Sequence, residues 1–151
     1  MVKRLHRFVS LAALAFWMGG FTFYALVVIP TGNWLLGSIG QGLVTQQVTN
    51  WMNLSGGLAL AILLPAARRS RWLTASWLVM AVTLLAQFGL HSRLDALIDR
   101  SLPAVIDDSQ FYRWHQAYLV AVTMQWSGAI AHLWCLTAEL CGPCESKNSS
   151  S

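Results

Sequence analysis

Charged residues are scarce in this sequence, at 11% of 151 residues, whereas a soluble domain carries about a quarter. Hydrophobic residues make up 56% of the chain. So few polar side chains cannot cover the surface of a globule, which argues against a soluble fold. The composition instead predicts an all-α integral membrane protein, and the length suits a single domain.

Cysteine is absent from most of the chain. All three cysteines lie in the last seventeen residues, so disulfides cannot hold the fold together. Two of them form Cys141-Gly142-Pro143-Cys144, the dithiol sequence of thioredoxin active sites. In those enzymes the first cysteine opens a helix, whereas here the predicted helix precedes the motif. We interpret the motif as a juxtamembrane turn, open to lipidation, with soft-metal capture alongside Cys135 and redox catalysis as alternatives.

Basic residues are few and gather beside apolar runs. Lys3, Arg4 and Arg7 precede the first run, and Arg68, Arg69 and Arg71 lie between the second and the third. The formal charge of +4 comes without a basic stripe interleaved with aromatic residues, so the predicted partner is an anionic lipid bilayer and not a nucleic acid. Because cytoplasmic loops carry the excess of Lys and Arg, both termini are predicted in the cytoplasm, in a multi-pass membrane protein.

Four apolar segments are long enough to cross the hydrocarbon layer as helices. They lie at about 8–29, 42–64, 72–90 and 114–140, and they predict a four-helix bundle over residues 1–140, followed by a disordered cytoplasmic tail at 141–151. The first segment is predicted to be retained and not cleaved as a signal, because its apolar run continues to Ile29 without a clear cleavage site. We expect it to end at the turn-forming cluster Pro30-Thr31-Gly32-Asn33, and we expect a short surface helix from Ser92 to Arg100.

Polar residues inside the predicted spans are the first candidates for function. The first third of the second span is polar, so its side chains need partners or water; they include Gln46, Asn50 and Asn53, besides Gln47 and Thr49. Gln87 of the third span and Gln125 of the fourth lie at about the same depth. We expect an interhelical hydrogen bond between them, with a polar substrate path as the alternative.

The four histidines are the second group of candidates. In the predicted topology His6 and His132 lie in the inner half, while His91 and His115 lie at the outer ends of the third and fourth spans. Each pair has the imidazole nitrogens that ligate haem iron or a transition metal, so haem b and copper are candidate cofactors. Alternatively, His6, His91 and His115 are interfacial polar residues, and the deeper His132 bonds a partner. The candidates for that partner are Ser127, Thr137, Gln125 or a group of the first span.

Small residues occur in mid-span at Gly19-Gly20, Ser55-Gly56-Gly57 and Ser127-Gly128-Ala129. Such residues let helix backbones approach closely. We therefore expect them to mark the packing seams of the bundle.

Two stretches of the sequence resemble a known family. The first is Leu5-His6 followed by Phe16-Trp17-Met18-Gly19-Gly20 and Val27-Val28-Ile29-Pro30, and the second is Phe111-Tyr112-Arg113-Trp114-His115, with Arg93-Leu94-Asp95 before it. In this order and spacing the chain resembles bacterial four-helix membrane proteins of unknown function related to transmembrane protein 205. The resemblance implies a bundle of four spans in a bacterial inner membrane.

The first stretch is also similar, more distantly, to copper-resistance D proteins and to HemJ-type protoporphyrinogen oxidases, in which an early histidine precedes a Trp and Gly pair. That similarity would give His6 a role in haem binding and catalysis. The HemJ type also carries a lysine in a later membrane helix, whereas the only lysines here are Lys3 and Lys147. From these resemblances we therefore expect the fold of these families but not their activity.

Two functions follow as hypotheses. The first is a non-enzymatic membrane protein, either a transport-related bundle or an accessory subunit of a membrane complex, with other subunits or a second copy as partners. The second is a haem- or metal-binding redox protein that uses His6 with His132, or His91 with His115. Hydrolysis and group transfer have no support, because topology brings no nucleophile, base and orienting group together.

Overall fold

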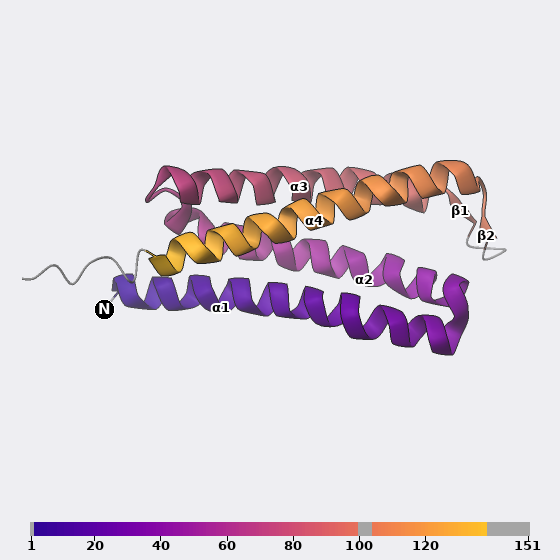
Figure 1. Cartoon of the computed structure of the whole chain (residues 1–151), viewed down its shortest axis with the longest axis horizontal. Coiled ribbons are helices and arrows are strands. Elements are labelled where there is room, and N and C mark those ends of the chain that lie inside the picture. The colour runs from indigo at the N-terminus through magenta and orange to yellow at the C-terminus, as the bar shows by residue number, and fades with distance from the viewer. Residues whose placement is uncertain (1, 100–103, 139–151) are drawn as a thin grey trace, which may run out of the picture.

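The polypeptide folds almost entirely into helices. The computed structural model describes residues 2–99 and 104–138 of the chain. The elements in chain order are α1 (Val2–Phe23), the π-helix η1 (Tyr24–Val28), α2 (Ile29–Ala67), α3 (Arg71–Asp95), the strands β1 (Ile98–Asp99) and β2 (Ala104–Val105), and α4 (Asp108–Ala138) (Figure 1). Three helical stretches, Arg4–Ala67, Arg71–Asp95 and Asp108–Ala138, are long and apolar enough to cross a membrane. The prediction of a helical protein whose helices are long and apolar enough to span a membrane is confirmed.

The first of these stretches is 64 residues long and folds back on itself at Gly37. Gly37 has φ +70° and ψ 171°, a backbone conformation that residues with a side chain rarely adopt. The two arms run antiparallel on either side of it (Figure 1). The Tyr24 hydroxyl donates to Thr45 Oγ1 at 3.0 Å, and farther from the turn Trp17 packs against Gly56. Residues 38–67 therefore return along α1.

The expected end of the first helix at Pro30 is wrong. The helix continues through the proline to the turn at Gly37. A proline inside an α-helix removes one backbone hydrogen bond, and its ring meets the carbonyl four residues earlier. In η1, which directly precedes the proline, the Ile29 N–H bonds the Tyr24 carbonyl five residues back. This widened turn accommodates the Pro30 ring within a continuing helix.

Helices α3 and α4 form the other pair, and polar groups join them at intervals. Gln87 Nε2 donates to Gln125 Oε1 at 2.5 Å, which confirms the hydrogen bond expected between these helices. Closer to the start of α3, Ser76 Oγ lies 2.8 Å from His132 Nδ1. Between these two contacts, a Cβ added at Gly128 would approach α3 side chains at 3.2 Å. The missing side chain therefore permits the close packing of the pair.

The small residues predicted to form packing seams fall into two groups. A Cβ on Gly56 would lie 2.9 Å from the Trp17 indole nitrogen, so α1 and α2 approach closely there, as α3 and α4 do at Gly128. Around Gly19 and Gly20 no side chain lies within 4 Å of an added Cβ. These two residues are exposed, and the seam expected at that point is wrong.

The apolar core lies in the half of the bundle that contains the start of α1 and the turn between α2 and α3. Its side chains from all the long helices include Leu14, Leu63, Leu73, Met80 and Ala129, which are fully buried. Ser70 caps α3 at the α2–α3 turn, because its Oγ accepts a hydrogen bond from the Leu73 N–H at 3.3 Å. The opposite half of the bundle is more polar inside.

The loop between α3 and α4 differs from the surface helix expected at Ser92 to Arg100. Helix α3 runs on to Asp95, and β1 then pairs with β2 in an antiparallel hairpin. Continuing the helix keeps Leu94 buried and places His91 and Asp95, four residues apart, on one face. Helix α3 therefore ends at Asp95, later than the predicted end at about 90, and α4 begins at Asp108, earlier than the predicted start at about 114.

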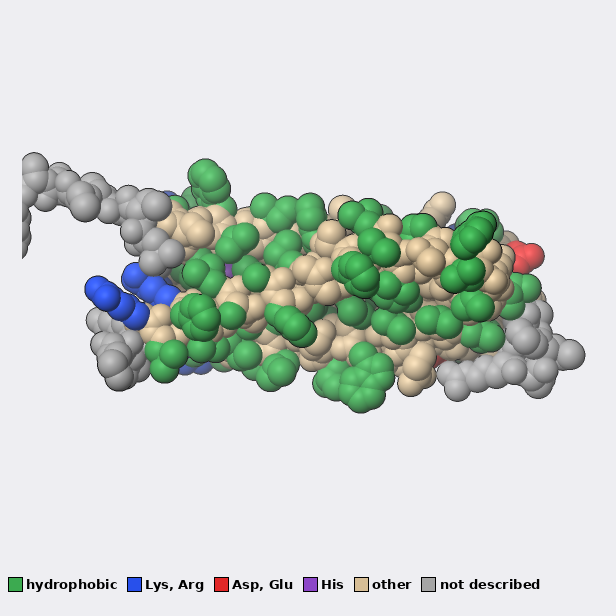
Figure 2. All heavy atoms as spheres, turned by 90° about the horizontal axis from the view of Figure 1, so that it is seen from below, with side chains coloured by type: hydrophobic (Ala, Val, Ile, Leu, Met, Phe, Trp, Pro, Cys, Tyr) green, Lys and Arg blue, Asp and Glu red, His purple; other side chains and the backbone are tan. Residues whose placement is uncertain are grey.

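The outer surface is apolar along its length and charged at its ends. Phe16, Trp34 and Trp134 expose 83%, 83% and 74% of their surface. Figure 2 shows hydrophobic side chains along the whole of one face, Lys and Arg at one end, and Asp or Glu at the other. Such a surface suits contact with lipid hydrocarbon between two polar interfaces.

Candidate functional site

A cavity of about 430 Å³ lies among α2, α3 and α4 at the end of the bundle that carries the Gly37 turn and the β1–β2 hairpin. We call it the polar cavity, because most of its lining side chains are polar, among them Gln41, Thr45 and Thr49 from α2. Concave sites of this size that combine apolar walls with a few placed polar groups are typical of small-molecule pockets.

Asp95 is the one carboxylate among the described residues that line the polar cavity, and no described Lys or Arg lines it. Gln46 Nε2 donates to Asp95 Oδ1 at 2.6 Å, and His91 Nε2 lies 3.6 Å from the same oxygen. His91 and Asp95 stand one turn apart on α3, so helical periodicity brings both to the cavity. Gln46 thus has the partner that the polar start of the second span was expected to need.

Gln41 and Thr45 form a second polar group on the wall. The Tyr24 hydroxyl donates to Thr45 Oγ1 at 3.0 Å, and Gln41 Nε2 donates to the same oxygen at 3.1 Å. The Gln41 side chain covers Gly32, where an added Cβ would overlap the Gln41 amide oxygen. Glycine at position 32 therefore leaves the room in which Gln41 is held.

Helix α4 supplies the aromatic part of the wall. The His115 ring stacks on the Phe111 ring one turn earlier, with centroids 5.8 Å apart and planes at 9°. Tyr118 lies farther in, where its hydroxyl faces Thr49 and Asn53 of α2. Phe111, His115 and Tyr118 are spaced at four and three residues, so they share one face of the helix.

Asp107 fixes where α4 begins. Its Oδ1 accepts hydrogen bonds from the Gln110 backbone N–H at 3.0 Å and from the Ser109 hydroxyl at 2.8 Å. These bonds favour the ionised carboxylate, so they hold the pKa of Asp107 below its ordinary value. The cap satisfies a backbone N–H in the first turn of α4, which otherwise has no partner within the helix.

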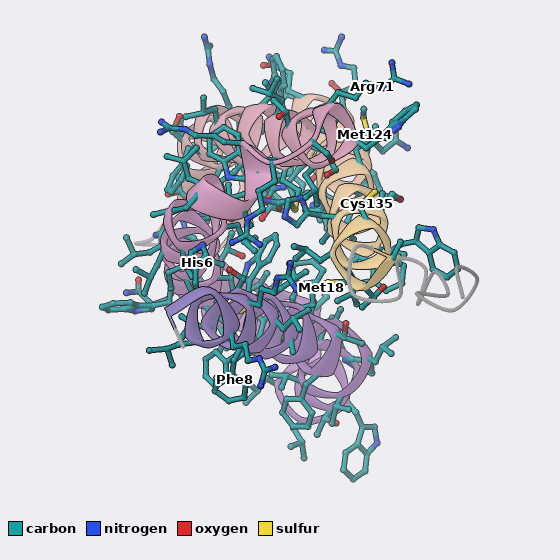
Figure 3. The ribbon with its side chains drawn as sticks, turned by 90° about the vertical axis from the view of Figure 1, so that its left-hand side faces the viewer. His6, Phe8, Met18, Arg71, Met124 and Cys135 are labelled. Carbon is teal, nitrogen blue, oxygen red and sulfur yellow. The ribbon has the colours of Figure 1, made fainter. Side chains whose placement is uncertain are left out.

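The structure brings together one of the two predicted histidine pairs. His91 and His115 line the same polar cavity. His6 turns toward the interior of the bundle, whereas Phe8 points outward (Figure 3). His132 is fully buried, but among the described residues no hydrogen bond joins it to His6. Its partner is Ser76 of α3, so the partners expected on α4 and on the first span were wrong.

The polar residues of the predicted second span divide by helical phase. Gln46 and Asn53 face the interior, and Asn53 is only 3% exposed. Asn50 and Gln47 lie on the exposed face of α2, so the expectation that the bundle shelters them is wrong. Positions 46, 49 and 53 fall on one face of a helix, and positions 47 and 50 fall on another.

Metal ligands do not gather in the described part of the chain. Within residues 2–99 and 104–138, no three His, Cys, Asp or Glu side chains are placed to hold a metal ion. Cys135 is a half-buried free thiol on α4. Cys141, Cys144 and the predicted tail at 141–151 lie outside the described residues, so the interpretation of that motif stays a prediction.

Sequence reasoning missed several residues of the polar cavity, among them Gln41, Thr45, Asp95 and Tyr118. Their spacing from residues already singled out was the available signal. Asp95 follows His91 by four positions, and Tyr118 follows His115 by three, so each shares a helix face with a candidate histidine. Thr45 precedes Thr49, which the sequence had singled out, by four positions, and Gln41 precedes Thr45 by four.

A scan against protein-family models, a search of curated proteins and a search of solved structures each found no match.

Proposed function

We propose that the protein crosses a bacterial inner membrane four times, with both termini in the cytoplasm. The stretch Arg4–Ala67 would supply two spans because it folds back at Gly37, and α3 and α4 would supply one each. The arginines at the start of α1 and around the α2–α3 turn support this orientation, since they gather at one end of the bundle (Figure 2). The polar cavity then belongs to the outer face. The same layout is implied by the resemblance to proteins related to transmembrane protein 205.

Cysteine accessibility tests this topology. In a variant whose native cysteines are replaced by serine, single cysteines are introduced at Asn33, Ser70 and Ser109. A membrane-impermeant maleimide is added to cells whose outer membrane is permeabilised and whose inner membrane is intact. It should label positions 33 and 109 but not position 70. Labelling of Ser70→Cys from outside would invert the topology.

We further propose that the polar cavity binds a small polar ligand. The protein would then act without catalysis, as a transport-related bundle or as the ligand-binding accessory subunit of a membrane complex. The observation that carries this proposal is the contact set of Gln46, His91 and Asp95 on the wall of a cavity of about 430 Å³. Ionisable groups inside a membrane protein are costly and occur mainly where they bind or conduct something.

Reactivity of a cysteine on the cavity wall tests whether ligands have access. A charged, water-soluble thiol reagent should modify Thr45→Cys in proteoliposomes, because Thr45 lines the polar cavity. Leu85→Cys is the matched control: this residue is 71% exposed but lies on the apolar surface that we assign to lipid, so the reagent should not reach it. An unreactive Thr45→Cys would mean that the cavity is closed to aqueous ligands and would contradict the proposal.

The exposed amides of α2 support association with another membrane helix, from a second subunit or a second copy. Asn50 is exposed and lies about 20 Å from Gly37 and about 27 Å from Arg68 at 1.5 Å per residue, near the middle of the helix. In hydrocarbon such an amide is best satisfied by an interhelical hydrogen bond. Light scattering in mild detergent tests this: a complex that Asn50→Leu weakens is expected, and a lone monomer without a co-purified partner would refute it.

A haem-binding redox protein is the second candidate, and one observation favours it. His91 and His115 line one cavity, and two imidazoles are donors that suit the iron of haem b. Copper is less well served, because no third ligand of the usual types converges among the described residues. The absorption spectrum of the purified protein distinguishes the candidates. A Soret band that His91→Ala removes would support haem binding, and a colourless protein would exclude it.

A further inference from the structure

We infer that the ligand of the polar cavity is a small organic cation whose charged nitrogen pairs with the Asp95 carboxylate. The inference rests on the proposed function and names the chemical class that the site would take. It begins from the sign of the charge, because the described lining contains one acidic side chain and no Lys or Arg. An anion would meet a carboxylate without a compensating base.

Asp95 is held in place on the cavity wall. Its Oδ1 accepts a hydrogen bond from Gln46 Nε2 at 2.6 Å, which fixes the carboxylate relative to α2. The side chain is 27% exposed, so most of its surface is shielded from water. Attraction between opposite charges rises as the effective dielectric constant falls. A cation that enters the cavity therefore gains more from Asp95 than it would from an acid in open water.

His91 competes with the cation for this carboxylate. Its Nε2 lies 3.6 Å from Asp95 Oδ1, its side chain is 10% exposed, and no described residue forms a hydrogen bond with this nitrogen. A neutral imidazole leaves the carboxylate charge to the ligand, whereas a protonated imidazole cancels it. The other titratable side chains on the cavity wall are His115 and Tyr118, both from α4.

The aromatic wall favours an organic cation over an inorganic one. Phe111 and Tyr118 line the same cavity as Asp95, and His115 stacks on Phe111. Aromatic faces attract an ammonium group and also give apolar contact to the methyl or methylene groups that it carries. Hydrated Na⁺ or K⁺ gains nothing from the second contact, and a volume of about 430 Å³ has room for the larger ligand.

Two probes of nearly equal shape test the charge requirement. Choline carries a quaternary nitrogen, and 3,3-dimethylbutan-1-ol has a neutral carbon in its place. We expect calorimetric titration of the full-length protein in non-ionic detergent to show at least about tenfold tighter binding of choline.

Substitutions at two acids assign the preference to one carboxylate. Asp95→Asn keeps the size of the side chain and an oxygen for Gln46 but removes the charge, so it should abolish the choline preference. Asp95→Glu keeps the charge and should restore much of it, which separates loss of charge from loss of fold. Asp107→Asn is the matched control, because Asp107 is an acid at the same end of the bundle that does not line the cavity.

The outcomes separate this inference from the proposed function. Equal binding of the two probes, or a preference that survives in Asp95→Asn, would overturn the cation and leave a ligand-binding cavity. Binding of neither probe would also overturn the cation. In that case, modification of Thr45→Cys would retain the cavity as a site for another class of ligand, and an unreactive Thr45→Cys would reject the proposed function as well.

Discussion

Gly56→Ala should force α1 and α2 apart. An added Cβ would lie 2.9 Å from Nε1, 3.1 Å from Cε2 and 3.2 Å from Cζ2 of Trp17. These atoms belong to a rigid indole that is 7% exposed, so the ring has little space into which to move. Overpacking of this kind costs about 1–3 kcal/mol, while replacing Gly by Ala in a helix interior gains about 1 kcal/mol. The net effect is a loss of up to about 2 kcal/mol in the free energy of unfolding.

Gly20→Ala is the matched control for this substitution. Nothing lies within 4 Å of an added Cβ at Gly20, so the variant gains helix propensity without overpacking. The difference between the two variants should therefore equal the overpacking cost alone, about 1–3 kcal/mol. Titration with SDS in mild detergent micelles, followed by far-UV circular dichroism, measures both free energies. Coincident unfolding curves would refute the packing of Trp17 on Gly56.

Three further perturbations test other parts of the fold. Gln87→Met and Gln125→Met should each destabilise the protein by about 1–2 kcal/mol, because each leaves a buried amide without its partner, and the double variant should lose less than the sum. Gly37→Ala should lower the free energy of unfolding by about 1–3 kcal/mol, because a φ of +70° is strained for any residue with a side chain. Gly89→Ala, at a helical position where an added Cβ meets nothing within 4 Å, should be neutral or slightly stabilising. SDS titration measures both variants. The cap at Asp107 should be intact above the ordinary carboxyl pKa of 3.8 and should be lost as the pH falls through the lower pKa of the folded protein. NMR shifts of the first-turn amides of α4 would measure this loss. Asp107→Asn should keep the cap without this pH dependence.

The apolar runs predicted the helices, but they did not predict where the first arm turns. A Pro-Thr-Gly-Asn cluster ordinarily ends a helix, whereas here the helix continues through the cluster because the widened turn η1 accommodates the Pro30 ring. The shift of the Ile29 N–H to a carbonyl five residues back is a backbone event without a side-chain signature. Gly37 is one of several glycines in this region, and its positive φ is selected by pairings such as Tyr24 with Thr45. Those pairings exist only after the arms have met.

The candidate site could be predicted in part for a similar reason. Counting residues from the span ends gave the depths of His91 and His115, and depth alone was enough to put them on the same side. Asp95 was missed because a separate surface helix was expected there, which removed it from the face of α3. Gln46 and Asn50 were treated alike because both are polar. Residues four positions apart lie on nearly the same side of a helix, so the sequence alone does not decide which of the two side chains faces inward. Only the packing of α2 against α3 settles that phase.

The distribution of buried side chains argues against passage of the ligand through the isolated bundle. Toward the opposite end, Leu14, Leu63, Leu73 and Leu136 are at most 5% exposed and belong to one packed core. A polar solute crossing this region would have to separate these side chains and give up its hydration. We therefore expect proteoliposomes to bind radiolabelled choline reversibly, with unlabelled external choline displacing all of it. Protein-dependent choline that resists this displacement would have entered the lumen, and it would show that the core opens and that the bundle transports on its own.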